Sequence, residues 1–265
     1  MYAFDYHRPG STADAARLCT GESRYLAGGQ SLVQSMRLRL ASAENLIDLG
    51  SIGELKGIES DGKTVRIGAM TTHAEVAASK DVQKALPALA ELAGGIGDMM
   101  VRNAGTIGGS LANADPAACY PAAVLGLNAT IHTAKRTIAA DDFFKGLYET
   151  ALEPGELITA VSFPVAKKAA YVKYKQPASR FALVGVMVAQ TDGGVRVAVT
   201  GAKATAFRVP ELEKALAADF AETAIANAKL ASDGMNADLH ASAEYRAAMI
   251  VVMARRAVAA ANARR

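Results

Sequence analysis

The chain has 265 residues, 51% of them hydrophobic, so it can bury a full core as one large domain or two modest ones. Its formal net charge of +3 is too small to predict a nucleic-acid partner, and no basic stretch is interleaved with aromatic residues. Cys19 and Cys119 are the two cysteines. They are too few for a disulfide scaffold, a four-cysteine zinc site or a cysteine-held iron–sulfur cluster within this chain.

The N-terminal segment lacks the apolar core of a signal peptide. No stretch reaches the roughly 18 apolar residues that a membrane-spanning helix requires. We therefore expect a cytoplasmic protein without a membrane span.

Short strands and helices alternate in the first part of the chain. Ser11 and Asp14 form a capping-box pattern that begins the first helix. Apolar residues recur at helical spacing within 31–40, and Pro87 interrupts or restarts a later helical stretch. In chain order we expect a short strand, a helix at 11–18, a strand at 24–27, a helix at 31–40, strands at 45–49 and 64–69, and helices at 72–78 and 82–93.

The predicted elements change near residues 164–168, from mixed short strands and helices to longer strands followed by alanine-rich helices. We take this point as a domain boundary. Before it, we expect a helix at 117–127, a strand at 129–138, a loop or short helix at 141–146, and a strand at 157–163. After it, we expect strands at 171–175, 181–190 and 195–200, then alanine-rich helices at 210–231 and 242–263. The segment Thr191-Asp192-Gly193-Gly194 is a hairpin signal between two of these strands. This order of strands and helices predicts an α+β protein.

Two glycine-glycine loops, at 27–31 and 106–110, share one pattern: two glycines follow an apolar residue, and a serine ends the loop. Glycine lets the backbone turn tightly and expose N–H groups, and a following serine can cap a helix. Such N–H clusters bind phosphate, so two of them predict a dinucleotide site. Neither loop has the spacing of a Rossmann or P-loop motif.

The segment 101–117, Val-Arg-Asn-Ala-Gly-Thr-Ile-Gly-Gly-Ser-Leu-Ala-Asn-Ala-Asp-Pro-Ala, closely resembles a signature of the FAD-binding medium subunits of molybdenum hydroxylases. This is the family of xanthine dehydrogenase and aerobic carbon monoxide dehydrogenase. The resemblance extends in order along the chain through the segments 25–32, 45–49, 67–73, 241–246 and 255–257.

The resemblance implies a two-lobed FAD-binding domain of the vanillyl-alcohol-oxidase (PCMH) type at 1–165, with lobes at roughly 1–55 and 56–165. A small C-terminal domain of sheet and helices would follow at 168–265. It places the FAD pyrophosphate between the two glycine loops, Ile96 near the flavin, and Lys175 reaching the flavin from the C-terminal domain. The expected cofactor-binding residues are Tyr25, Leu26, Ala27, Gly28, Gly29, Gln30, Ser31, Leu32, Ile96, Thr106, Ile107, Gly108, Gly109, Ser110, Asp115, Cys119 and Lys175.

One departure from the family concerns the ribose. Cys119 stands where relatives usually carry an acidic residue that accepts from the ribose hydroxyls; Asp115 or water could take its place. Two other residues have plainer interpretations. His73 has no second histidine at metal spacing and is expected to be packed or capping, and Cys19 is expected to be a small core residue on a helix.

The resemblance also implies the function of an electron-transfer subunit. A small subunit with two [2Fe–2S] clusters would pass electrons to FAD on this chain, and a large subunit would carry the molybdenum cofactor, in a heterotrimer or its dimer. The terminal acceptor stays open among NAD, a quinone, dioxygen and another carrier. We expect neither catalytic acid–base residues nor metal ligands here. The alternatives are a stand-alone FAD-dependent oxidase of the same fold and a non-catalytic scaffold whose glycine loops are only turns.

Overall fold

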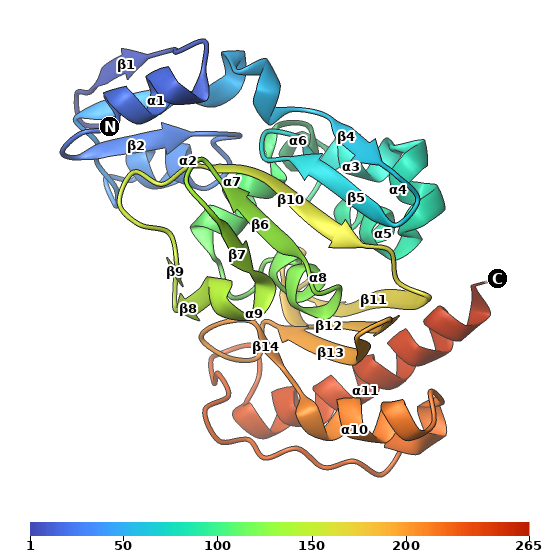
Figure 1. Ribbon diagram of the computed structural model, residues 1–265. Coiled ribbons are helices and arrows are strands. Elements are labelled where there is room, and N and C mark those ends of the chain that lie inside the picture. The colour runs from blue at the N-terminus through green and yellow to red at the C-terminus, as the bar shows by residue number, and fades with distance from the viewer. Residues whose placement is uncertain (265) are drawn as a thin grey trace.

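The computed structural model describes residues 1–264 and leaves residue 265, the last of the expected C-terminal domain, outside the described part. Three main sheets follow one another along the chain. In Figure 1 the N-terminal sheet is at the top, a five-stranded sheet lies in the middle, and the C-terminal sheet with α10 and α11 is at the bottom. The fold is therefore α+β, as the sequence predicts.

The N-terminal sheet is parallel and has the order β1-β3-β2. Its strands are β1 (Asp5–His7), β2 (Ser23–Leu26) and β3 (Asn45–Asp48). Ser11 caps α1 (Thr12–Leu18) by accepting from the Asp14 N–H, which confirms the predicted helix start. The glycine loop at 27–31 leaves β2 and leads into α2 (Leu32–Arg37).

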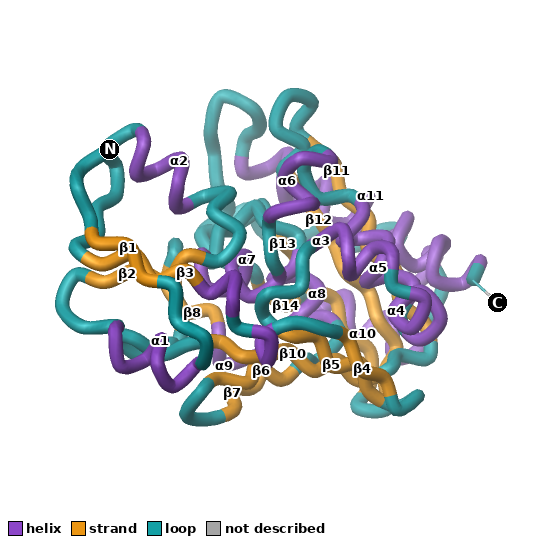
Figure 2. Tube along the Cα trace, turned by 90° about the horizontal axis from the view of Figure 1, so that it is seen from above, coloured by secondary structure: helices purple, strands orange, loops and turns teal. Residues whose placement is uncertain are grey.

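The five-stranded sheet is antiparallel, in the order β4-β5-β10-β6-β7. Seen from above, α7 lies between the N-terminal sheet on one side and α4 and α5 on the other (Figure 2). The strands are β4 (Ile58–Ser60), β5 (Thr64–Gly68), β6 (Thr130–Thr133), β7 (Thr137–Ala139) and β10 (Ile158–Pro164). The helices are α3 (His73–Ala78), α4 (Lys80–Ala85), α5 (Pro87–Gly94), α6 (Met99–Ala104), α7 (Ile107–Asn113), α8 (Tyr120–Gly126) and α9 (Ala140–Phe143). A small pair, β8 (Phe144–Gly146) and β9 (Glu149–Thr150), lies after α9.

The C-terminal sheet is an antiparallel meander of β11 (Lys168–Lys175), β12 (Ala182–Thr191), β13 (Gly194–Thr200) and β14 (Phe207–Arg208). Thr191 pairs with Gly194, which confirms the predicted hairpin. The helices α10 (Pro210–Ala218) and α11 (Ala243–Ala263) follow. Ser242 caps α11 by accepting from the Tyr245 N–H.

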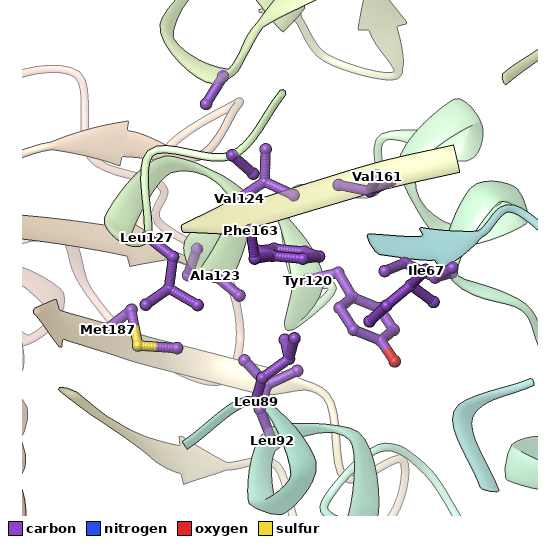
Figure 3. Close-up of a cluster of buried hydrophobic side chains, with 14 of the residues drawn as sticks. Ile67, Leu89, Leu92, Tyr120, Ala123, Val124, Leu127, Val161, Phe163 and Met187 are labelled. Atoms are coloured by element: carbon purple, nitrogen blue, oxygen red, sulfur yellow. The ribbon is translucent and has the colours of Figure 1, made fainter. Parts of the chain in front are cut away.

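One continuous apolar core joins the middle and C-terminal sheets. Tyr120 and Phe163 are fully buried in it, and Met187 of β12 enters the same cluster beside Leu127 (Figure 3). Because this core spans both units, β11 and β12 are held firmly against α5 and α8. That packing fixes the C-terminal sheet relative to the site described below.

Three predicted elements are wrong in extent. The helix expected at 210–231 ends at Ala218, because Asp219 is extended and the chain turns to pack Phe220 and Ile225 into the C-terminal core. The helix expected to reach residue 40 ends at Arg37, and Arg39 is left-handed, with a φ of 61°. The strand expected at 129–138 is two strands, β6 and β7, joined by a tight turn.

Among residues 1–264, no helix combines the length and the apolar character needed to cross a bilayer.

Candidate cofactor site

A cavity of about 480 Å³ lies where the N-terminal sheet, α7 and the C-terminal sheet approach one another. Both glycine loops line it. So do most of the other residues predicted from the sequence to bind a cofactor. These lining residues are Tyr25, Ala27, Gly28, Gly29, Gln30, Ser31, Leu32, Ile96, Thr106, Gly108, Gly109, Ser110, Asp115 and Cys119.

The two glycine loops lie against each other. A Cβ on Gly28 would be 2.0 Å from the carbonyl oxygen of Ala104, and one on Gly109 would be 3.3 Å from the Cβ of Ala27. Real Cβ atoms do not tolerate the first of these distances, so any larger residue at position 28 would push the loops apart. The close approach brings the two loops to one wall of the cavity.

The loops differ in the hydrogen bonds that their backbones offer. In the second loop every N–H from Ile107 to Ser110 donates within the chain. Ile107 donates to the Thr71 carbonyl, Gly108 to the Ala69 carbonyl (2.8 Å), Gly109 to the Thr106 Oγ1 (3.1 Å), and Ser110 to the Thr106 carbonyl. The expectation that this loop presents a cluster of free N–H groups is therefore wrong. Thr106, rather than a serine, caps α7.

The first loop is different. Within the described chain, the N–H groups of residues 28–31 donate no hydrogen bond. Ser31 precedes α2 without a side-chain cap, so the capping role expected of this serine is also absent. Backbone N–H groups that face a cavity without a partner are strong donors for an anion. Of the two loops, the first therefore supplies the free backbone donors for an anion, and the second packs beside it at the same wall of the cavity.

Three predicted residues do not line the cavity. Ile107 is fully buried in the core, Leu26 is half-buried away from the cavity, and Lys175 is exposed at the end of β11. The lysine that lines the cavity is Lys173, two residues earlier. A register irregularity falls between Tyr174 and Lys175, so the strand geometry that brings Lys173 to the cavity does not continue to Lys175.

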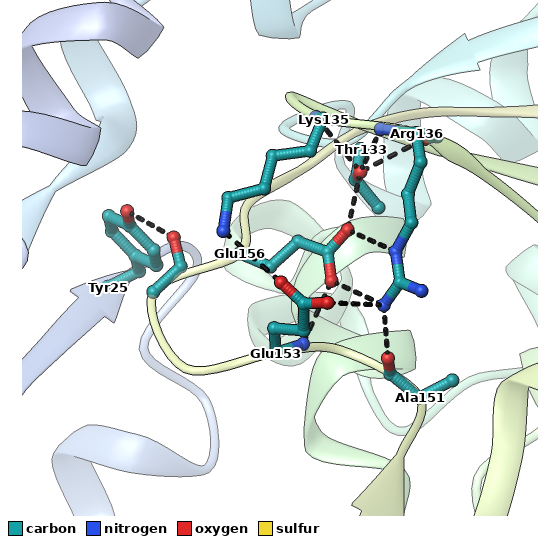
Figure 4. A network of polar contacts seen from close by, with 8 residues as sticks. Tyr25, Thr133, Lys135, Arg136, Ala151, Glu153 and Glu156 are labelled. Atoms are coloured by element: carbon teal, nitrogen blue, oxygen red, sulfur yellow. Dashed lines mark hydrogen bonds and ion pairs between the residues drawn. The ribbon is translucent and has the colours of Figure 1, made fainter.

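A polar network supports one end of the cavity (Figure 4). The buried Glu156 carboxylate accepts from Arg136 Nε and Nη2, both at 2.9 Å, and from Thr133 Oγ1 at 2.8 Å. These contacts lower the pKa of Glu156 to about 2, mainly through the Arg136 hydrogen bonds. The adjoining Gly155 carbonyl accepts from the Tyr25 hydroxyl at 3.0 Å. The network thus links the 151–158 segment to the N-terminal sheet.

The sequence interpretation missed the proximity of several residues to the cavity, and two of them are His73 and Cys19. His73 is 5% exposed and lines the cavity, and its Nδ1 has no hydrogen-bond partner in the described structure. Burial, with a smaller effect of Arg102, lowers the pKa of His73 to about 4, so its ring is neutral at physiological pH. Cys19 is the residue at the C-terminal end of α1; it packs against the N-terminal apolar core, as expected, and it also lines the cavity. No local sequence pattern predicts that these two side chains reach the cavity, because contacts between distant segments of the chain bring them to it.

Asp115 and Cys119 both lie at the cavity wall. One Asp115 carboxylate oxygen accepts from the Ala117 N–H at 2.8 Å, and burial raises the pKa of this carboxyl. Cys119 is 4% exposed. An acidic side chain therefore lines the same cavity as the cysteine.

The cavity has the features needed for a large anionic ligand: free N–H donors, a close approach that only glycine permits, and an unpartnered buried imidazole. Within residues 1–264, no group of three or more His, Cys, Asp or Glu side chains is placed to hold a metal ion. The arrangement suits binding and orienting a cofactor rather than acid–base catalysis by side chains.

Comparisons with known proteins agree with this geometry. Residues 2–166 match the family described as the FAD binding domain in molybdopterin dehydrogenase. The carbon monoxide dehydrogenase medium chain of Afipia carboxidovorans is 41% identical, over 99% of this chain and 98% of its own length. The nicotine 6-hydroxylase medium subunit of Paenarthrobacter nicotinovorans is 37% identical over 99% of this chain and 98% of its own. A chain of the reconstituted CO dehydrogenase from Oligotropha carboxidovorans is 38% identical and superposes with a TM-score of 0.92, over 100% of this chain and 99% of that one.

Proposed function

Since the chain belongs to the family of FAD-binding domains of molybdopterin dehydrogenases, we propose that its cavity holds FAD and that it is the electron-transfer subunit of a molybdenum-containing hydroxylase or dehydrogenase. The observation that carries the proposal is the joint cavity of the two glycine loops, with its unpartnered N–H groups.

The FAD diphosphate would accept hydrogen bonds from the N–H groups of residues 28–31, facing the second glycine loop. Ile96, which lines the same cavity, would lie near the flavin ring. The ribose hydroxyls would meet Asp115, because the Cys119 thiol is a weak acceptor. When bound, FAD supplies the one- and two-electron redox chemistry. The chain's own residues bind it, orient it and set its electrostatic surroundings.

The partners follow from the relatives. The two relatives named above are a medium chain and a medium subunit, and their names differ in substrate, carbon monoxide in one case and nicotine in the other. Such similar chains serving different substrates fit a subunit that handles electrons while another subunit binds the substrate. A small subunit with [2Fe–2S] clusters would deliver electrons to the flavin, and a large subunit would carry the molybdenum cofactor. Together they would form a heterotrimer, or its dimer, in the cytoplasm.

The proposal is tested by purifying the protein from its host with the partners that it retains. Denaturation should release FAD, identified by mass spectrometry, in a one-to-one ratio with this chain. Iron and molybdenum should co-purify on other chains. A flavin-free preparation would overturn the proposal. Turnover of a small organic donor by this chain alone would favour a stand-alone oxidase instead.

A further inference from the structure

Lys173 carries an ammonium group at the cavity wall without a carboxylate partner. Its Nζ donates to the Gly95 carbonyl at 2.9 Å, to the Arg180 carbonyl at 2.8 Å and to the Cys119 Sγ at 3.3 Å. None of the ion pairs within residues 1–264 includes it. All three acceptors are neutral groups, so the side chain is fixed in place while its charge is not compensated.

The neighbouring charges do not cancel that of Lys173. Arg180 also lines this end of the cavity, and its guanidinium donates to the Gly97 carbonyl at 3.4 Å rather than to a carboxylate. Two carboxylates line the cavity, Asp115 and Glu156, and neither forms an ion pair with Lys173 or Arg180; Glu156 pairs with Arg136. A half-buried cation without a counter-ion favours negative charge in the space beside it, and low solvent exposure strengthens the effect.

The three hydrogen bonds also hold Lys173 where its charge can stabilise negative charge in the cavity. They join the end of α5, the start of α8 and the 176–181 segment around one end of the cavity, where Ile96 and Gly97 also lie. An ammonium anchored from three sides keeps a fixed distance from whatever occupies the cavity. Its electrostatic effect therefore needs no rearrangement when charge develops there.

We propose that Lys173, anchored by these three neutral acceptors, sets the redox potential of the bound flavin by stabilising the negative charge that the cofactor gains on reduction. The inference rests on the proposed function and assigns this role to Lys173 rather than to the exposed Lys175. Lys173 would make reduced flavin more favourable and so help this subunit to accept electrons from its iron–sulfur partner.

The test compares Lys173→Met, Lys173→Gln, Lys173→Arg and the matched control Lys175→Met in the purified complex. The readout is the flavin midpoint potential, measured by spectroelectrochemical titration. Both neutral variants at position 173 should lower the ratio of reduced to oxidised flavin at a fixed potential by roughly tenfold or more, which is about 30 mV for a two-electron couple. Lys173→Arg and Lys175→Met should stay close to the wild-type protein.

An unchanged potential in flavin-loaded Lys173→Met and Lys173→Gln, or an equal shift in Lys175→Met, would overturn the inference while leaving the proposed function intact. If both neutral variants lose the flavin, Lys173→Arg decides: retained flavin supports the role of the charge, and lost flavin assigns position 173 to packing and overturns the inference. Absence of FAD from the wild-type complex would instead refute the proposed function itself.

Discussion

Replacing Glu156 by glutamine should lower the free energy of unfolding by about 3 kcal/mol at pH 7. The Glu156 side chain is fully buried, whereas that of its partner Arg136 is 43% exposed. Holding the pKa of this carboxyl near 2, against an ordinary value of 4.5, corresponds to about 3 kcal/mol of folding free energy.

The pH dependence gives this prediction its sign. Because the pKa of Glu156 is lower in the folded chain than in the unfolded one, its stabilising effect is complete above about pH 4.5 and is lost as the pH falls towards 2. Urea unfolding followed by circular dichroism at pH 7, 5 and 3 should therefore show the variant and wild-type curves converging at the lowest pH.

Glu153→Gln is the matched control. The Glu153 side chain is 56% exposed and lies 3.3 Å from Lys135, so its loss should cost less than about 1 kcal/mol. Equal effects of the two substitutions, or a Glu156→Gln effect that persists undiminished at pH 3, would refute the reasoning.

Three further predictions concern the cavity itself. Gly28→Ala should weaken FAD retention roughly tenfold or more, because its Cβ would collide with backbone. The control Gly53→Ala, whose Cβ would meet nothing within 4 Å, should bind FAD normally; equal losses in both would contradict the account. The imidazole of His73 should titrate by NMR near pH 4, and a midpoint near 6.5 would show that it is not held in a buried site. FAD should slow the thiol labelling of Cys19 and Cys119 in the native protein, since both line the cavity; labelling rates that ignore FAD would place the cofactor elsewhere.

The parts of the site encoded in short segments could be predicted from the sequence. The two glycine loops are visible as a repeated pattern, and their joint cavity follows once both are assigned to one ligand. The start of α1 at Ser11 and the hairpin at 191–194 are also set by neighbouring residues. Each of these features depends on residues a few positions apart, so local physical chemistry determines it.

The rest depends on contacts between distant segments. Two N–H groups of the second glycine loop, those of Ile107 and Gly108, donate to the Thr71 and Ala69 carbonyls, which only the folded chain brings close. Lys173 and Lys175 are the same residue type on the same strand. Only the register of β11 against β12 determines which of them lines the cavity. Likewise, α10 ends at Ala218 because the following segment packs Phe220 and Ile225 into the C-terminal core, which helix propensity does not predict.

A structure of the protein with its flavin bound would show directly where the diphosphate lies. We expect diphosphate oxygens within about 3.2 Å of the backbone nitrogens of residues 28–31, between the two glycine loops, with the flavin ring beside Ile96. A diphosphate bound away from residues 27–31, or a flavin outside this cavity, would contradict it.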